Sequence, residues 1–211
     1  MMYSLSNDTW DEEEISAAHK VIDSRLFTIG KYVKQYEQEF AEKFGAKYAV
    51  MSNSGSSANL LAMGALVYSG KVKRGDEVIV TAVSWSTTYF PVSQFGLKLR
   101  FVDIAMDTLN VDTDALEAAV TPKTKVVMAV NLLGNPNDFT AIRQICEKYE
   151  LIMLEDNCES MGAKFGNKYA GTFGLIGTFS TYYSHHLCTM EGGMSVTDDE
   201  EMYHYMLSIR S

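Results

Sequence analysis

Residues 151–158 read LIMLEDNC, and residues 179–193 read FSTYYSHHLCTMEGG. In the first stretch, four apolar residues run directly into Glu155 and Asp156, a pattern typical of a buried strand that ends in carboxylates. A carboxylate there is costly unless it has a cationic partner, although an acidic surface loop gives the same pattern. In the second stretch, the adjacent His185 and His186 separate an aromatic run from a Glu-Gly-Gly turn. The chemistry of the chain is therefore expected at these two stretches.

Outside them, short apolar runs alternate with helical patterns. Strand patterns cover residues 48–51, 78–81, 99–102, 126–130 and 152–154, and helical patterns cover residues 57–67, 112–119 and 139–149. Apolar strands separated by helices predict an α/β fold of three layers, with a mostly parallel sheet covered on both faces. Ligands of such sheets bind at the carboxyl ends of the strands, so the residues that follow each strand are the candidate site residues.

Two helix patterns precede the first predicted strand. Thr9 and Glu12 form a T-x-x-E capping box, which predicts the start of a helix. The apolar stripe of that helix consists of Ile15, Ala18, Val21 and Ile22. After a loop at residues 27–30, a second amphipathic helix is predicted over residues 33–44, ended by Gly45. We expect residues 1–30 to form an N-terminal helix and arm, and residues 31–211 to form the main domain.

The first predicted strand runs into SNSGSS at residues 52–57 and then into a helix. Gly55 permits a tight turn, Ser56 and Ser57 supply hydroxyl groups, and the backbone N–H groups of the helix start point outward. This is the arrangement of a phosphate cradle. A simple helix cap would give the same residues, so both interpretations stay open on this stretch alone.

The second predicted strand is followed by SWSTTY at residues 84–89. Trp85, with hydroxyl groups beside it, can stack on a flat ring or can pack in the core. After the fourth predicted strand, Asn131 leads into a turn that Gly134 and Pro136 favour. Near the end of the chain, the acidic residues 198–201 predict a solvated helix start, because carboxylates favour that end of the helix dipole.

The composition excludes several functional classes. The chain has 211 residues, of which 46% are hydrophobic, enough for one sizeable core. A net charge of -9 argues against binding to nucleic acid or to an anionic membrane. No signal-peptide or membrane-spanning pattern is found. Three widely spaced cysteines fit a reducing cytoplasm better than a disulfide framework, a zinc site or an iron–sulfur site. We expect a cytoplasmic location and no bound metal.

In order, these pieces resemble the DegT/DnrJ/EryC1/StrS sugar aminotransferase family. The stretches that carry the resemblance are DTW at 8–10, KQYEQEF at 34–40, SGSSANLL, AVSWSTTY, NLLGNPN, LEDNCESMGA, GTFGLIGTFS, YSHH and TMEGG. The resemblance covers essentially the whole chain. It implies that residues 31–211 are the large, cofactor-binding domain of an aspartate-aminotransferase-type, or fold type I, pyridoxal phosphate (PLP) enzyme. Family members continue into a smaller C-terminal domain, which implies that this chain is truncated and lacks that domain.

The position of the family's Schiff-base lysine is occupied differently here. The family typically shows a serine, four residues, the lysine and then a Gly-Gly turn. In this chain the same spacing runs from Ser180 to His185. Imidazole cannot form the imine that a lysine amine forms, so the resemblance implies a noncovalently bound cofactor, either PLP or pyridoxamine phosphate (PMP). His186 lies one residue beyond, and its role stays open.

The resemblance also implies a role for each candidate site residue. His185 is the catalytic acid and base, since its ordinary pKa suits both roles near neutral pH. Asp156 pairs with the pyridine nitrogen, and Trp85 stacks on the ring. Glu159 lies near the cofactor's phenolic oxygen. The residues implied to hold the phosphate are Gly55, Ser56, Ser57 and Ser180. For His185 and His186, a polar pair satisfied within a loop is the alternative interpretation.

The histidine favours the branch of the family that removes the C3 hydroxyl of a nucleotide-linked 4-keto-6-deoxy sugar. The resemblance implies glutamate as the amino donor that restores PMP, a role in deoxysugar and O-antigen biosynthesis, and a homodimer. Two alternatives stay open. One is a nucleotide-sugar aminotransferase of the same family, which needs a lysine at position 185. The other is a truncated, noncatalytic cofactor-binding domain.

Overall fold

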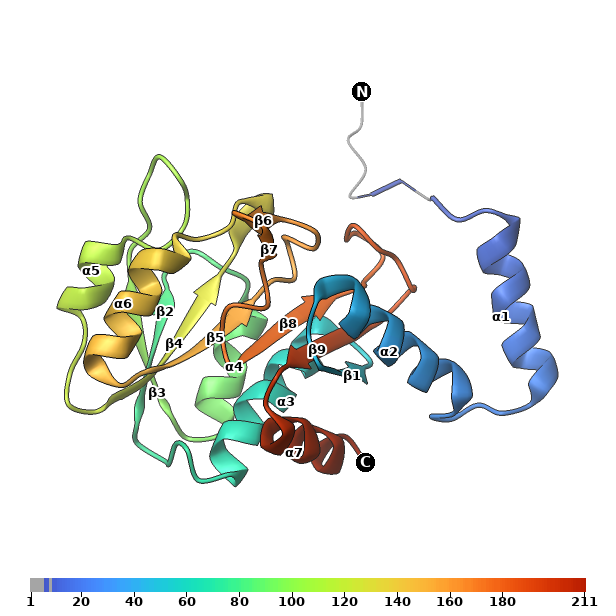
Figure 1. The fold of residues 1–211 in the computed structure, drawn as a ribbon, viewed down its shortest axis with the longest axis horizontal. Coiled ribbons are helices and arrows are strands. Elements are labelled where there is room, and N and C mark those ends of the chain that lie inside the picture. The colour runs from blue at the N-terminus through green and yellow to red at the C-terminus, as the bar shows by residue number, and fades with distance from the viewer. Residues whose placement is uncertain (1–5, 8) are drawn as a thin grey trace.

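The computed structural model describes residues 6, 7 and 9–211. Its helices are α1 Glu12–Ser24, α2 Lys31–Phe44, α3 Gly55–Tyr68, α4 Ser86–Gln94, α5 Thr113–Ala118, the 3₁₀ turn η1 Leu132–Gly134, α6 Phe139–Tyr149 and α7 Glu200–Arg210. Its strands are β1 Tyr48–Ser52, β2 Glu77–Thr81, β3 Lys98–Val102, β4 Thr124–Val130, β5 Ile152–Asp156, β6 Lys164–Phe165, β7 Lys168–Tyr169, β8 Ile176–Ser180 and β9 Gly193–Thr197. Helices and strands alternate along most of the chain (Figure 1).

The sheet is mostly parallel, as predicted. Its 7 strands lie in the order β1-β9-β8-β5-β4-β2-β3. β8, β5, β4, β2 and β3 pair in parallel, whereas β9 is antiparallel to both β8 and β1. β1 therefore runs in the same direction as the parallel strands, and their carboxyl ends share one edge. β6 and β7 form a separate two-stranded hairpin.

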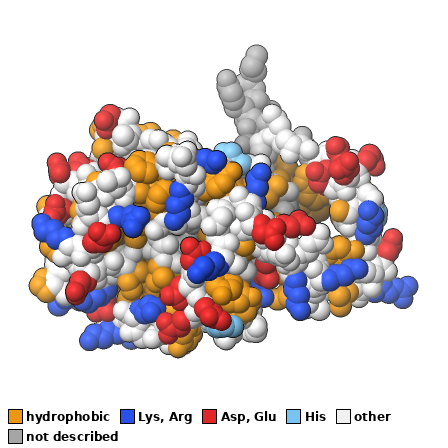
Figure 2. All heavy atoms as spheres, viewed as in Figure 1, with side chains coloured by type: hydrophobic (Ala, Val, Ile, Leu, Met, Phe, Trp, Pro, Cys, Tyr) orange, Lys and Arg blue, Asp and Glu red, His pale blue; other side chains and the backbone are white. Residues whose placement is uncertain are grey.

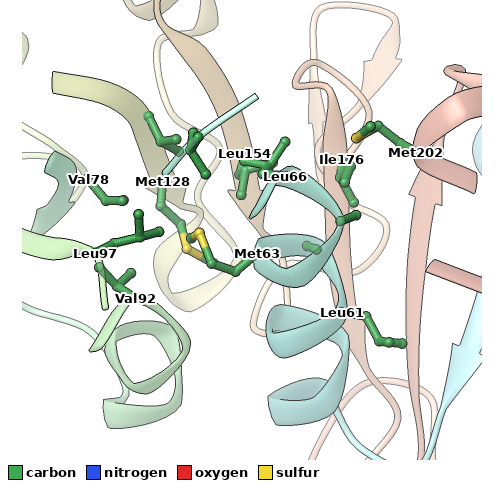
Figure 3. Packing of buried hydrophobic residues seen from close by; sticks show 14 of the residues in the cluster. Leu61, Met63, Leu66, Val78, Val92, Leu97, Met128, Leu154, Ile176 and Met202 are labelled. Atoms are coloured by element: carbon green, nitrogen blue, oxygen red, sulfur yellow. The ribbon is translucent and has the colours of Figure 1, made fainter. Parts of the chain in front are cut away.

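Helices cover both faces of the sheet and make three layers. On one face, α3, α4 and α7 bury a core around Met63, Leu66 and Met128, to which the sheet contributes alternate residues such as Leu154 and Ile176 (Figure 3). On the other face, α5 and α6 pack on β2, β4 and β5, and α2 packs on β1, β8 and β9. Strands buried on both faces explain the continuous apolar runs of the sequence.

The predicted strands and helices are confirmed within a few residues, but α4, β8, β9 and the short β6–β7 hairpin were not predicted. α4 begins without a side-chain cap and contains Pro91, so it lacks the usual helix signals. β8 and β9 read IGTFS and GMSVT, and their glycine, serine and threonine residues interrupt the apolar pattern. These polar side chains are buried because other elements accept their hydrogen bonds: Thr178 Oγ1, for example, donates to Asn59 Oδ1 at 2.6 Å.

The predicted capping box at Thr9 and Glu12 is wrong. α1 begins at Glu12, and its cap is Asp11, whose side chain accepts a hydrogen bond from Glu13 N while Glu14 Oε2 accepts one from Asp11 N. Aspartate caps a helix at least as well as threonine, so the same box forms two residues later. Gly45, with φ of 74°, ends α2 as predicted.

α1 stands apart from the rest of the molecule (Figure 1). None of its residues is buried, and its apolar side chains Ile15 and Ile22 are exposed. Acidic side chains gather at its first turn, whereas charges of both signs are interspersed over the rest of the face shown in Figure 2. The stripe predicted from the sequence therefore exists but finds no cover within the described part of the chain.

A cofactor-type cavity at the carboxyl ends of the strands

The carboxyl ends of β1, β5 and β8 and the start of α4 surround one cavity of about 540 Å³. Its lining consists of Ser54, Gly55, Ser56, Ser84, Trp85, Thr87, Thr88, Val130, Asp156, Cys158, Glu159, Ser180, Tyr182, Ser184, His185 and Glu191. All but one of the predicted site residues are in this set; the exception is Ser57. Six parallel strands place these residues together, because their carboxyl ends meet at one edge of the sheet.

Asp156, the last residue of β5, is a buried carboxylate with a fixed orientation. Its Oδ2 accepts hydrogen bonds from Asn59 Nδ2 and Thr88 Oγ1, both at 2.8 Å, and its Oδ1 accepts one from Cys158 N at 3.1 Å. Within the described residues it makes no ion pair. A buried carboxylate held only by neutral donors is suited to a cationic ligand group.

Glu155, its neighbour, has a different task. Its carboxylate points away from the cavity lining and accepts hydrogen bonds from the backbone N–H groups of Gly171, Phe173 and Gly174. Burial raises the pKa of Glu155, and these N–H groups oppose that rise. The sequence therefore contains two carboxylates with two roles: Glu155 fixes the turn at residues 171–174, and Asp156 serves the cavity.

The SNSGSS stretch at residues 52–57 forms a helix cap and also a cradle at the cavity, the two interpretations that its sequence allows. Ser54 Oγ caps α3 by accepting a hydrogen bond from Ser57 N at 3.1 Å. The N–H groups of Gly55 and Ser56 precede this bond and belong to the first turn, where a helix has no partner of its own to offer them. Gly55 and Ser56 line the cavity, whereas Ser57 turns its hydroxyl toward Ser54 Oγ, at 3.2 Å.

The cradle has room only because two positions are glycine. A Cβ atom on Gly55 would lie 2.6 Å from Ser180 Cβ and 2.8 Å from Cys158 Sγ. A Cβ atom on Gly193 would lie 2.1 Å from Ser54 O and 2.7 Å from Gly55 N. The Glu-Gly-Gly turn therefore brings the start of β9 against the backbone of the cradle, which a larger residue would push into the cavity.

Trp85 lies at the mouth of the cavity and is 70% exposed. The interpretation of Trp85 as a core aromatic is therefore wrong. It precedes α4 directly, and two residues of that helix, Thr87 and Thr88, line the same cavity. An exposed indole at the mouth of a cavity is available to stack on a flat ligand.

His185 lies on the loop between β8 and β9 and is half-buried. Burial lowers the pKa of its imidazole, and the carboxylate of Glu159 opposes that effect, while His186 lowers the pKa further. His186 itself is exposed and does not line the cavity. The two adjacent histidines thus have different surroundings, and of the two only His185 lines the cavity.

Glu159 is positioned from outside the cavity. Its Oε2 accepts a hydrogen bond from Leu133 N at 3.1 Å. Leu133 has the left-handed φ of 51°, which costs a leucine on the order of 1 kcal/mol. The turn η1 thus adopts a strained conformation that aims an N–H group at this carboxylate.

The model of the DegT/DnrJ/EryC1/StrS aminotransferase family matches residues 8–211. The chain belongs to the DegT/DnrJ/EryC1/StrS aminotransferase family. The resemblance inferred from the motifs is thereby confirmed.

Similar proteins in this family include GDP-4-keto-6-deoxy-D-mannose 3-dehydratase of Yersinia pseudotuberculosis, 60% identical over 99% of this chain and 54% of the relative. A solved structure of the E. coli GDP-4-keto-6-deoxy-D-mannose-3-dehydratase with bound hydrated PLP is 59% identical, with a TM-score of 0.95, over 99% of this chain and 54% of that one. Another structure of a GDP-4-keto-6-deoxymannose-3-dehydratase holds a trapped PLP-glutamate geminal diamine. It is 58% identical, with a TM-score of 0.96, over 99% of this chain and 55% of that one.

The chain thus spans about half the length of the curated relatives it matches. The predicted fold is confirmed: the sheet and its helices match fold type I enzymes of this family.

Sequence reasoning missed several residues that line this cavity or support its lining. Asn59 and Thr88 hold Asp156, yet each lies inside a helix and looks like an ordinary polar residue of that helix. The other missed residues of the lining are Ser54, Ser84, Thr87, Val130, Cys158, Tyr182, Ser184 and Glu191. For Asn59 a signal existed, because an asparagine in the apolar face of a helix needs a buried partner.

The cavity of this family member is acidic. Its lining includes the carboxylates of Asp156, Glu159 and Glu191 and, within the described part of the chain, no lysine or arginine. It can therefore receive a protonated ring nitrogen, but it offers no cationic side chain to a diphosphate or a dicarboxylate.

Residues 6, 7 and 9–211, which the structure describes, contain neither a membrane-spanning helix nor a metal-type cluster. The helices there are either too short or too polar to cross a membrane. In the same residues no cluster of His, Cys, Asp and Glu side chains has the arrangement of a metal site.

Proposed function

We propose that the chain is the cofactor-binding part of a PLP/PMP-dependent dehydratase. The proposed reaction removes the C3 hydroxyl from a nucleotide-linked 4-keto-6-deoxy sugar, of the type of GDP-4-keto-6-deoxy-D-mannose, with glutamate regenerating PMP. The observation that carries the proposal is that one cavity contains both Asp156 and His185, with histidine where the family places its lysine. Two relatives named as this dehydratase support the substrate class.

The residues of the cavity fit the cofactor. Asp156 would hold the pyridine nitrogen, since its carboxylate is buried, oriented and without a cationic partner in the described structure. Trp85 would cover the ring. Gly55, Ser56 and Ser180 would hold the phosphate, the first two through the N–H groups that start α3. Ser57 stays in this group as a prediction. Its hydroxyl lies against Ser54 Oγ, and Ser54 itself lines the cavity.

When bound, PMP supplies an amine for the C4 ketone of the sugar and a ring that withdraws electrons from the reacting carbon. The chain supplies the proton transfers. His185 can accept a proton from a carbon atom in the cavity, and it can donate one to the departing C3 hydroxyl. Its lowered pKa favours the neutral, proton-accepting form at the start of the cycle. Glu159, held by Leu133 N, would face the phenolic oxygen of the cofactor.

The proposal is tested first by the way in which the cofactor is held. PLP added to the purified chain should bind at one site. Imidazole forms no imine for borohydride to reduce, so treatment with borohydride should leave PLP noncovalently bound, and denaturation should then release it. His185→Lys in the same chain should instead retain one cofactor per chain after the same treatment. Intact-protein mass spectrometry measures both outcomes.

The control is competition with PMP, which carries no aldehyde and therefore separates the cavity from surface lysines. A stoichiometric, PMP-sensitive adduct on the parent chain would contradict the noncovalent site and would favour the aminotransferase alternative. Failure of both PLP and PMP to bind at all would contradict the proposed cofactor site.

We also propose that the active site is completed by residues outside the described cavity. A nucleotide diphosphate and glutamate are both anionic, whereas the cavity of this chain carries three carboxylates, Asp156, Glu159 and Glu191, and no lysine or arginine among the described residues. Cations must therefore come from another subunit or from the C-terminal small domain that the family resemblance predicts. Turnover by the 211-residue chain alone is expected to be negligible for this reason.

A two-fold homodimer is one way for a second subunit to supply these cationic side chains, and the arm at residues 1–30 supports such a dimer. α1 buries none of its residues, and Phe27 in the arm is 74% exposed. Phe90, close to the cavity, is 55% exposed. Apolar groups gathered at this density favour a subunit interface, and two-fold dimers are the commonest oligomers. The boundaries of the arm, 1–30, and of the large domain, 31–211, belong to the same proposal.

The dimer is tested by charging the exposed stripe of α1. The double variant Ile15→Asp and Ile22→Asp should weaken self-association by about 100-fold or more, because each isoleucine buried at an interface contributes about 1.5–3 kcal/mol. Sedimentation velocity at micromolar concentration measures the change. Folding should be unaffected, since none of the residues of α1 is buried in the described chain.

The matched control is Lys20→Asp, which adds a similar charge to the opposite side of the same helix. It should leave the dimer intact. A parent chain that sediments as a monomer would contradict the proposal, and so would a dimer that tolerates the double variant.

We place the protein in the cytoplasm. Cys146, Cys158 and Cys188 are free thiols, which is the usual state of cysteine in a reducing compartment. By its resemblance the protein belongs to deoxysugar and O-antigen biosynthesis.

A further inference from the structure

The loop that carries His185, residues 181–192, is held largely by its own hydrogen bonds. The backbone N–H groups of Tyr183, His185 and Thr189 donate to Met190, Tyr182 and Thr181, and each of these bonds closes inside the loop. They give the loop an internal shape. They do not fix that shape against the sheet or the cavity, so the position of the imidazole depends on what else holds the loop.

One such contact comes from the far end of the chain. The indole Nε1 of Trp10 donates a hydrogen bond to the backbone oxygen of Cys188 at 3.1 Å, across a sequence separation of 178 residues. Trp10 is half-buried, and Cys188 lies three residues from His185. An indole N–H group is only a donor, so a carbonyl at this place is its natural partner. A flat, bulky side chain also restricts the loop sterically.

We propose that Trp10 is a positioning residue, which holds the loop so that His185 faces the cavity. The inference rests on the proposed function in so far as it concerns catalysis by His185. Trp10 does not touch the candidate cavity, and it acts through the loop alone. Trp10 directly precedes Asp11, the cap of α1. A partner subunit that binds α1 would therefore fix Trp10 as well.

The energetic argument concerns how finely a proton-transfer group must be placed. A misplacement on the order of 1 Å can cost about 100-fold in rate. The loop has no helix or strand to hold His185, and three large residues next to it, Tyr182, Tyr183 and Leu187, are exposed. A single hydrogen bond from outside the loop is therefore enough to bias its position, since loops of this kind open with little free energy.

The test replaces Trp10 with phenylalanine, which keeps an aromatic ring and removes the N–H donor. Amide hydrogen exchange of the 211-residue chain, followed by mass spectrometry, needs neither substrate nor cofactor. Peptides covering residues 182–191 should exchange about five-fold faster, the factor that matches loss of one ordinary hydrogen bond. Peptides from β8 and β9 should be unchanged, because their ladder bonds do not involve Trp10.

A matched control is Tyr68→Phe, which removes a polar group from an exposed aromatic residue at the far end of α3. It should change exchange nowhere in the loop. Unchanged exchange of residues 182–191 in the Trp10→Phe variant would overturn the proposal. Equal acceleration in the loop, β8 and β9 would also overturn it, since that result means general destabilisation.

A second readout reports on His185 directly. The chain contains 4 histidines, so the imidazole resonances can be assigned by single substitutions. Burial lowers the pKa of His185 in the held loop, and release of the loop should raise that pKa toward the ordinary value. An NMR titration in which the pKa of His185 does not move in Trp10→Phe contradicts the inference. Neither readout depends on turnover, so the positioning role can fail while the proposed function stands, and the reverse.

Discussion

Replacing His185 with asparagine should abolish dehydration in an active form of the protein while cofactor binding persists. Asparagine keeps a polar side chain of moderate size but cannot exchange a proton near neutral pH. General acid–base catalysis typically contributes about 100- to 10,000-fold, so a loss in that range is expected in kcat. Binding should change little, because Asp156 and the start of α3, the proposed cofactor contacts, are unchanged in the variant. Single-turnover kinetics and PLP titration measure the two effects separately.

The adjacent histidine provides the control. His186→Asn changes the same side chain one residue away, in an exposed position that does not line the cavity. It should retain most of the activity. Turnover of His185→Asn within a few-fold of the parent would show that another group moves the proton.

The pH dependence of the parent gives an independent check. Burial lowers the pKa of His185 below its ordinary 6.5, so the neutral imidazole persists to lower pH. The acid limb of kcat/KM, which reports the free enzyme, should therefore lie below pH 6.5 and should disappear in the variant. An acid limb well above that value would mean that Glu159, whose charge raises the pKa of His185, outweighs burial.

The sequence predicted the fold well where burial is two-sided. β4 and β5 are buried on both faces, so their apolar runs are continuous. Such runs are easily distinguished in the sequence from the amphipathic patterns of the neighbouring helices. Prediction failed where polar residues are buried by contacts distant in sequence. β8 contains Thr178, whose hydroxyl bonds Asn59 from 119 residues away, and no local pattern announces such a pair.

The site was predictable in part for a similar reason. Residues that follow strands converge whenever the sheet is parallel, which predicts that Asp156 and Trp85 lie at one edge of the sheet. His185 follows β8, a strand that the apolar pattern does not predict, so its place rested on the family resemblance. The supports of these residues were not predictable. Thr88 and Asn59 hold Asp156 from two helices, and their contribution depends on how those helices pack.

The exposed apolar residues can also be read only in part from the sequence. The arm and the region around Trp85 carry exposed apolar groups, Phe27 and Phe90 among them. What covers them depends on a surface outside this chain. Leu133 shows the limit of local rules: a leucine with positive φ is improbable from sequence, and it occurs because its N–H group reaches Glu159.

Replacing Asp156 with asparagine should weaken the cofactor site and slow both halves of the proposed reaction. The variant removes the charge that would keep a ring nitrogen protonated. A hydrogen bond to a charged group contributes about 1.5–3 kcal/mol, so the affinity for PMP should fall roughly 10- to 100-fold. Asp156 is buried at 5% exposure, which favours the upper part of this range because water cannot replace the lost interaction.

The amide also disturbs the network that holds this position. Asn59 and Thr88 both donate to Oδ2, and Cys158 N donates to Oδ1, so the parent carboxylate accepts three hydrogen bonds. An asparagine presents one oxygen and one NH₂ group, and in either orientation its NH₂ group faces a donor. Leaving a buried donor unpaired costs about 1–3 kcal/mol, and thermal or urea unfolding should show that loss of stability.

Thr88→Val separates the two consequences. It removes one of the three donors to Asp156 but keeps the charge, so it should lower stability while leaving the affinity for PMP within a few-fold. If Asp156→Asn lowers affinity no more than Thr88→Val does, the carboxylate is a structural acceptor only. If glutamate converts PLP to PMP at the parent rate in the Asp156→Asn variant, the ring nitrogen lies elsewhere. A loss of affinity and rate specific to Asp156→Asn is the outcome expected from a carboxylate that three neutral donors orient toward a cation.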